Sequence, residues 1–164
     1  MGPHSAGPRE SPRLTDRRRI GHTTAPTTHA VDAWRVRLFC QAIGDSDPVF
    51  HDADAAKRAG HPACPVPPTF LKALESEHQS GIALMKLLDA PIGGVLHVEQ
   101  SFEFDAPVHV GDTVEITRTV MDIFDKRGGA MTFVVVDSHF RVAGLPVGHA
   151  RQTLMLRNAA PAAA

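Results

Sequence analysis

Cysteine is scarce in this chain of 164 residues, which holds only Cys40 and Cys64. Two cysteines make neither a disulfide framework nor a four-cysteine metal site, so we expect reduced thiols in a cytoplasmic protein. None of the ten histidines is paired in an HxxxH or HExxH spacing, and there is no CxxC motif. Because these spacings are the usual signs of a metal site, the sequence gives no support for one.

Other absences narrow the class of protein. The net charge is −1, so no basic excess indicates a nucleic-acid partner. The longest apolar runs are far too short to cross a bilayer, so no membrane partner is expected. The chain also lacks a nucleophile elbow, a phosphate-binding loop and a dinucleotide-binding glycine motif. Its length suits one domain with a real core rather than two.

The two ends differ from the middle of the chain. Residues 1–19 are rich in Pro, Gly and Arg and hold hardly an apolar residue, and residues 158–164 are mostly alanine. We expect both to be disordered tails around a folded domain of residues 20–157. The arginines at 17–19 lack the apolar or amphipathic pattern of a targeting signal, so they indicate a solvated segment.

Helical spacing of apolar residues marks the first half of the chain. We expect helices over residues 33–43, 53–60, 68–79 and 82–90. Asp32 can cap the first of these, and Gly44 is well placed to end it. Four prolines within residues 61–70 exclude a continuous helix there. One side of the helix over residues 68–79 should carry Phe70, Leu71, Leu74 and His78.

After Pro91 the spacing changes from helical to alternating. We expect strands over residues 95–104, 112–120, 131–142 and 147–156, with residues 27–31 as a candidate edge strand. One face of the first strand should carry Leu96, Val98, Phe102 and Phe104. The connections are short and rich in turn residues, so the four strands should meander antiparallel.

Helices followed by an antiparallel sheet indicate the α+β class. The helix over residues 68–79 is long enough to fill the concave side of a strongly curved sheet, which is the hot-dog arrangement. One sheet edge and one helix face then remain poorly covered, which favours a dimer. We therefore predict a single hot-dog domain.

Four segments carry a resemblance to a known family. They are "AIGDSDPVFHDADAAKRAG", "VPPTF", "LHVEQSFEFDAPVHVGD" and "GGAMTFVVVDSHF". In this order and spacing the chain resembles the MaoC-like dehydratases of the hot-dog superfamily. It is most similar to the N-terminal-type half of two-part (3R)-hydroxyacyl thioester dehydratases. The resemblance covers residues 20–157.

The resemblance implies addition of water to a 2-enoyl thioester, or its reversal, on a chain carried by coenzyme A or acyl carrier protein. In that chemistry a carboxylate and an imidazole hold one water and move its protons. A backbone N–H at a helix start stabilises the thioester oxygen. The resemblance implies no metal and no redox cofactor. It also implies a homodimer or a heterodimer with a second hot-dog subunit.

Active members of the family carry the motif D-x-N-P-x-H-x-D. On this sequence its first Asp falls on Asp45, and its His falls on Phe50, one residue before His51. Phenylalanine cannot move a proton, and neighbouring residues point in different directions. Either the loop is remodelled so that His51 enters the site beside Asp45, or the imidazole is lost and a partner half supplies it. We favour the second interpretation and keep Asp45 and His51 as the catalytic candidates.

Further candidates would contact the substrate. The resemblance implies that the helix start at residues 66–69 presents backbone N–H groups to the thioester oxygen, so Val66, Thr69 and the following Phe70 are binding candidates. Phe50 and His97 are further candidates for substrate binding. Each also has a structural interpretation. Asp45 can bond the next backbone N–H of a turn, His51 can be a surface neighbour of a helix cap, Thr69 can satisfy the helix end, and His97 can be a hydrogen-bonded interface residue.

Two other functions remain open. Many hot-dog proteins are thioesterases, in which a single carboxylate such as Asp45 or Glu75 activates water without a histidine. The chain can also be a non-catalytic acyl-binding subunit that lines the acyl tunnel of an active partner.

Overall fold

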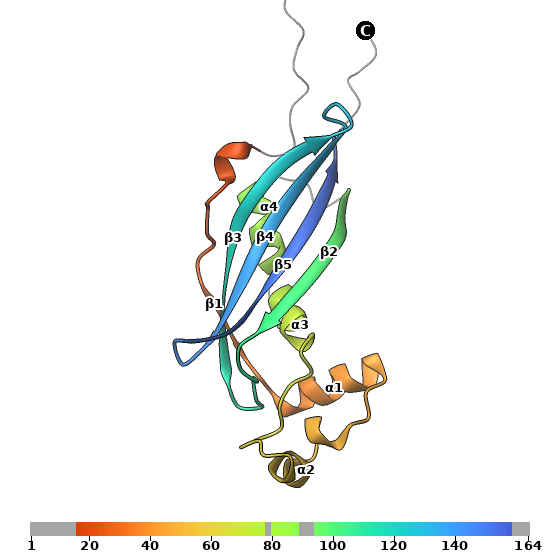
Figure 1. The fold of residues 1–164 in the computed structure, drawn as a ribbon, viewed down its shortest axis with the longest axis vertical. Helices are drawn as coiled ribbons and strands as arrows, with labels where there is room; N and C mark the ends of the chain where they lie inside the picture. Colours follow the sequence, from red (N-terminus) through yellow and green to blue (C-terminus); the bar gives the residue numbers. More distant parts are fainter. Residues whose placement is uncertain (1–15, 78–79, 89–93, 159–164) are drawn as a thin grey trace, which may run out of the picture.

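The computed structural model describes residues 16–77, 80–88 and 94–158. Its helical elements are η1 (Arg17–Arg19), α1 (Ala33–Ile43), η2 (Pro48–Phe50), α2 (Ala53–Arg58), α3 (Phe70–Ser76) and α4 (Ser80–Leu88). Its strands are β1 (Thr27–Ala30), β2 (Val95–Phe104), β3 (Thr113–Lys126), β4 (Met131–Val142) and β5 (Leu145–Arg157). Figure 1 shows α3 and α4 one after the other along one face of the sheet, with α1 and α2 beyond one end.

The predicted tails lie mostly outside the described residues. Within the first of them, η1 is a single 3-10 turn capped by Asp16, whose carboxylate accepts the backbone N–H of Arg18 at 2.9 Å. The chain then joins the sheet, because the N–H of Gly21 donates to the carbonyl oxygen of Val120 at 2.8 Å. No helix in the described part of the chain is long and apolar enough to span a membrane.

The five strands form one antiparallel sheet in the order β1-β3-β4-β5-β2. The predicted meander is correct for β3, β4 and β5 and wrong for β2, which pairs with β5 at the far edge. The reason lies in the segment between β2 and β3. Instead of closing a hairpin, this segment bonds to the proline-rich residues 61–70, which we call the crossing. Val66 N–H donates to Val108 O, and Val110 N–H donates to Cys64 O, both at 2.8 Å.

Strand β2 contains a bulge that changes which side chains share a face. His97 pairs with Leu154 and Glu99 with Thr153, so Val98 has no partner in the ladder. Leu96 therefore lies on the outer face and is 47% exposed, whereas Phe102 packs against the core. The prediction that Leu96 and Phe102 share a face is wrong, because one extra residue inverts the alternation.

The predicted helix over residues 68–79 is shorter in the structure, where α3 covers Phe70–Ser76, and the predicted helix over residues 82–90 corresponds to α4, Ser80–Leu88. Helix α3 ends because Glu77 adopts an extended backbone, with φ −80° and ψ 165°, and its N–H donates to Leu74 O. His78, expected on the inner side of that helix, lies outside the described residues. The carboxylate of Glu77 forms an ion pair with Arg35 of α1, which ties the end of α3 to that helix.

The core divides into two apolar clusters along the concave face. The cluster beneath α3 includes Val36, Phe70, Leu71, Leu74, Ile116 and Phe140. The cluster beneath α4 includes Leu84, Leu88, Val120, Val134, Val136 and Leu154. Full burial of one such side chain stabilises the fold by about 1.5–3 kcal/mol. These two clusters hold the helices on the sheet.

A polar row crosses the sheet between the two clusters. On the concave face Arg118 lies between Ile116 and Val120 along β3, and Ser138 is its ladder partner on β4. Glu75 of α3 lies over this row and is 1% exposed. Its Oε1 accepts hydrogen bonds from Arg118 Nε at 2.7 Å and Ser138 Oγ at 2.6 Å. We call this group, completed by Lys72 and Gln152, the Glu75 cluster.

Lysine 72 closes the Glu75 cluster on its open side. Its Nζ donates to Glu75 Oε2 at 2.8 Å and to Gln152 Oε1 at 2.9 Å. Arg118 Nη2 also donates to the backbone oxygen of Glu75 at 2.5 Å. Because these bonds join α3 to three strands, they fix where the helix lies along the sheet.

Replacing Glu75 by alanine should lower the free energy of unfolding by about 3–5 kcal/mol, because the buried charge of Arg118 would lose its carboxylate partner. Urea unfolding followed by circular dichroism measures this change. Glu99→Ala, at an exposed position of β2, is the matched control and should change stability by less than about 0.5 kcal/mol. Equal effects of the two substitutions would contradict the anchoring role of Glu75.

Candidate functional site

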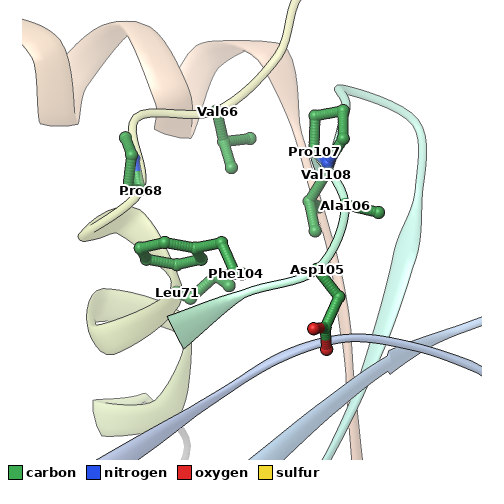
Figure 2. A pocket seen from close by; sticks show the side chains of 8 residues that line it. All are labelled: Val66, Pro68, Leu71, Phe104, Asp105, Ala106, Pro107 and Val108. Atoms are coloured by element: carbon green, nitrogen blue, oxygen red, sulfur yellow. The ribbon is translucent and has the colours of Figure 1, made fainter. Parts of the chain in front are cut away.

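A cavity of about 320 Å³ lies where the proline-rich crossing meets the end of β2. Its lining is Val66, Pro68, Leu71, Phe104, Asp105, Ala106, Pro107 and Val108. In Figure 2 the ring of Phe104 lies next to Pro68 and Leu71, and the carboxylate of Asp105 points away from Val66. An apolar cavity with one carboxylate at its rim has the character of a site for a ligand with an apolar chain.

The walls of this cavity are fixed by backbone contacts. The bond from Val66 N–H to Val108 O joins the crossing to the segment after β2. At the end of β2, Phe104 pairs with Gly148 of β5. A Cβ on Gly148 would lie 2.6 Å from the backbone oxygen of Glu103 and 3.2 Å from Cα of Phe104. Only glycine therefore allows β5 to approach the strand end that carries Phe104.

The loop between α1 and α2, residues 44–52, is called the Asp45 loop here. It forms a separate pocket of about 350 Å³ next to α1. Both Asp45 and His51 line it, together with Arg37, Cys40 and Gln41 of that helix. Asp45 Oδ1 accepts the backbone N–H of Asp47 at 3.0 Å, which is a turn contact. The structure thus brings the two catalytic candidates to one pocket, and it engages Asp45 in holding the turn.

The rest of the loop consists of successive caps. Asp47 Oδ1 accepts the N–H of Val49 and starts the 3-10 turn η2. Asp52 Oδ1 accepts the N–H groups of Asp54 and Ala55 and starts α2. The bonds from Ala55 and Asp54 hold the pKa of Asp52 below its usual range. These local caps are enough to give the loop a defined shape.

The turn η2 sets the directions of Phe50 and His51. Phe50 is half-buried and packs against the cluster beneath α3, whereas His51 is exposed on the pocket side. The position that carries the imidazole in the family motif is thus filled by an apolar side chain that packs against the core. A catalytic role for His51 stays a prediction.

The expected oxyanion site at the start of α3 is only partly available. The N–H of Phe70 donates to Pro67 O at 2.8 Å, and the Phe70 side chain is 2% exposed. Thr69 is exposed, and its side chain makes no capping bond. Within the described residues the backbone N–H of Thr69 has no acceptor, so it is the donor that a thioester oxygen could reach.

His97 lies in a third pocket, of about 240 Å³, with Lys72, Glu75 and Arg118. The sequence candidates therefore divide among three places: Asp45 and His51 in the loop pocket, Val66 at the cavity under the crossing, and His97 beside the Glu75 cluster. Among the described residues, no group of three or more His, Cys, Asp or Glu is placed to hold a metal ion.

The protonation of Glu75 follows from its surroundings. Burial favours the neutral acid, but the positive charges of Lys72 and Arg118 outweigh it and hold the pKa of Glu75 below its usual range. A buried carboxylate that is ionised and accepts hydrogen bonds from Lys72, Arg118 and Ser138 is poorly suited to take a proton from water. This geometry does not favour Glu75 as a water-activating base.

Sequence reasoning named Glu75 but missed the residues around it. The available signal was the interrupted alternation of the strands. Two residues after the buried Ile116 and Ala150, where alternation predicts further apolar side chains, the sequence has Arg118 and Gln152. A charged residue at such a position almost always has a buried partner.

Comparison with known proteins shows the family to which the chain belongs. Residues 18–150 match the model of the FAS1-like dehydratase domain region, and the chain belongs to this family of hot-dog dehydratase domains. A UPF0336 protein of Saccharopolyspora erythraea is 33% identical over 143 residues, covering 86% of this chain and 90% of that protein. The predicted family resemblance and the single α+β hot-dog domain are confirmed.

Two solved structures share the fold. The C-terminally truncated HadBC (3R-hydroxyacyl-ACP dehydratase) complex of Mycobacterium tuberculosis superposes with a TM-score of 0.75 at 26% identity, over 87% of this chain and 98% of the matched chain. The ChsH1-ChsH2 complex of the same organism gives a TM-score of 0.69 at 20% identity, over 85% of this chain and 87% of that one. The second likeness concerns the fold alone.

The acid sensitivity of the protein should depend on Glu75. Because its pKa is lowered on folding from the ordinary value of 4.5, ionised Glu75 stabilises the fold above that pH, and the stabilisation is lost as pH falls through the folded pKa. The difference in unfolding free energy between the protein and Glu75→Gln should therefore be largest near neutral pH and shrink in acid. Urea titrations at neutral pH and below the folded pKa measure it. A difference that stays constant with pH would contradict the assignment.

Gly148→Ala should destabilise the protein by about 1–3 kcal/mol, because the added Cβ would collide with backbone atoms of β2 that cannot move freely. Ser101→Ala, at an exposed position of the same strand pair, is the control. Thermal unfolding compares the two. A Gly148→Ala protein as stable as the control would show that β2 and β5 are further apart at this point.

Proposed function

We propose that this chain is the substrate-tunnel half of an acyl-thioester hydratase or dehydratase, and that a partner hot-dog subunit supplies the catalytic pair. The reaction would interconvert 2-enoyl and (3R)-3-hydroxyacyl thioesters of coenzyme A or acyl carrier protein. The proposal rests on one observation: the family's imidazole position is occupied by Phe50, a half-buried side chain that packs against the core.

The chemistry explains why that one position matters. Hydration requires that water lose a proton as its oxygen attacks C3 and that C2 gain one. A carboxylate and an imidazole sharing one water can do both. In this chain Asp45 holds the backbone of its turn, and Phe50 has no group that can carry a proton. A partner subunit with a complete motif would provide both.

The cavity under the crossing supports an acyl-binding role. Its lining is apolar apart from Asp105 and the backbone, and Phe104 at its edge is 46% exposed. The N–H of Thr69 is nearby in sequence, two residues before Leu71 of the lining. A thioester could place its acyl or pantetheine chain against Phe104 and Leu71.

The edge strand β2 supports a protein partner. It pairs only with β5 among the described strands, and its outer side chains Leu96 and Val98 are 47% and 54% exposed. A second hot-dog sheet could pair along this edge and cover these side chains. The matched HadBC structure is, by its own description, a complex of a 3R-hydroxyacyl-ACP dehydratase. A homodimer with the same edge remains the alternative arrangement.

A self-sufficient hydratase is the second candidate function. It is favoured by one observation, namely that Asp45 and His51 line the same pocket although His51 is one residue late in the motif. In that case the displaced pair would hold the water within this chain.

Turnover of crotonyl-CoA, followed by loss of the enoyl absorbance, tests the proposal. We expect no turnover by the folded chain alone. Adding a MaoC-like subunit with the complete D-x-N-P-x-H-x-D motif should give activity above that of the subunit alone, and His51→Ala should leave this gain unchanged.

The control for this assay is Lys57→Met, an exposed substitution on α2 that should behave like the unchanged chain. Turnover by the chain alone that both Asp45→Asn and His51→Ala abolish would overturn the proposal in favour of the self-sufficient enzyme. Release of free thiol from an acyl-CoA by the chain alone would instead identify a thioesterase.

A further inference from the structure

The pocket beside the Glu75 cluster lies apart from the cavity under the crossing. It has a volume of about 240 Å³ and is bounded by the end of α3, by α4 and by strands β2, β3 and β5. The two linings share no residue: Leu71 borders the first, and Lys72, Glu75 and Ser76 border the second. We propose that this second pocket binds a free carboxylate with a short apolar chain, with Lys72 holding the carboxylate group.

The charges of the cluster favour an anion. Lys72 and Arg118 carry two positive charges, and Glu75 between them carries one negative charge. A buried group with an excess of positive charge in a medium of low dielectric attracts an anion more strongly than an exposed one. An incoming carboxylate would balance the excess.

Lys72 is the member of the cluster that a ligand can reach. Its side chain is 27% exposed, compared with 6% for Arg118 and 1% for Glu75. An ammonium group has three N–H donors, and the bonds to Glu75 and Gln152 use two of them. The third can donate to a carboxylate oxygen, and hydrogen bonds between charged groups are the stronger kind. Since Lys72 is already fixed by two bonds, it loses little freedom on binding.

The opposite side of the pocket is apolar. Leu84 of α4 and Leu154 of β5 are 4% and 6% exposed, and Met85 and Val95 complete this wall. An apolar cavity of about 150 Å³ accommodates benzene, so the pocket has room for a carboxylate with a chain of roughly six carbons. An inorganic anion would leave this wall unused, which is why we assign an amphiphile.

His97 lies on the edge-strand side of the pocket, because the bulge at Val98 turns it toward Leu154. The same bulge keeps Leu96 on the outer face. A ring N–H from His97 can add a second donor to the bound carboxylate. The bulge therefore gives β2 a polar group on the inner face of an otherwise apolar wall.

Isothermal titration of the full chain with hexanoate at neutral pH tests the proposal. We expect saturable binding of one hexanoate per chain. 1-Hexanol, which has the same chain without the charge, should bind at least about tenfold more weakly, because it cannot form the charge-assisted bond. Lys72→Met should weaken hexanoate binding by a similar factor, and Lys57→Met on α2 should not change it.

A second variant separates binding from folding, because Lys72→Met also removes a partner of Glu75. Met85→Trp should fill the apolar side and abolish hexanoate binding while the Glu75 cluster stays intact, and circular dichroism confirms that the variant is folded. Absence of saturable binding by the unchanged chain would overturn the proposal. Equal affinity for hexanoate and 1-hexanol, or unchanged binding by both folded variants, would also overturn it.

Discussion

The ion pair between Glu75 and Arg118 fixes the position of the central helix on the sheet. Apolar contacts alone allow a helix to slide along a face of similar side chains, because hydrophobic burial has no direction. A buried carboxylate that accepts three described hydrogen bonds, on a residue whose backbone oxygen accepts a further one from Arg118, has one position in which all of its partners are met. Helix α3 takes its place on the sheet from this contact, whereas the crossing before it is held by its own backbone bonds to the segment after β2.

The site has two kinds of support. The wall around Phe104 and Val66 is held by backbone bonds between segments distant in sequence, whereas the Asp45 loop is held by its own carboxylates. A loop shaped by local caps keeps its form whether or not it performs chemistry. The sequence motif around Asp45 therefore identifies the loop more securely than it identifies a catalyst, because a shared fold does not fix the chemistry.

Element type was predictable from spacing, and the resemblance of four sequence segments indicated the family, but side-chain direction was not predictable. Helix α1, which ends at Gly44 as predicted, and the strands β3, β4 and β5 follow from local patterns. The predicted cap at Asp32 is not seen, because its side chain makes no capping hydrogen bond. The inversion at Val98 depends on ladder pairing between β2 and β5, and the burial of Phe50 depends on a turn packed against a distant core. Both are long-range effects. Arg118 in an apolar row did give a local sign of the buried cluster, although only the structure shows its partner.

The bulge at Val98 has a consequence for assembly. A flat edge strand accepts almost any extended chain, including further copies that would lead to aggregation. An edge interrupted by one unpaired residue presents two short stretches whose hydrogen-bonding groups are out of phase with each other. Only a strand with a matching irregularity, or one that stops at the interruption, can pair along the full length. The bulge at Val98 thus limits which strands can pair with the free edge of β2.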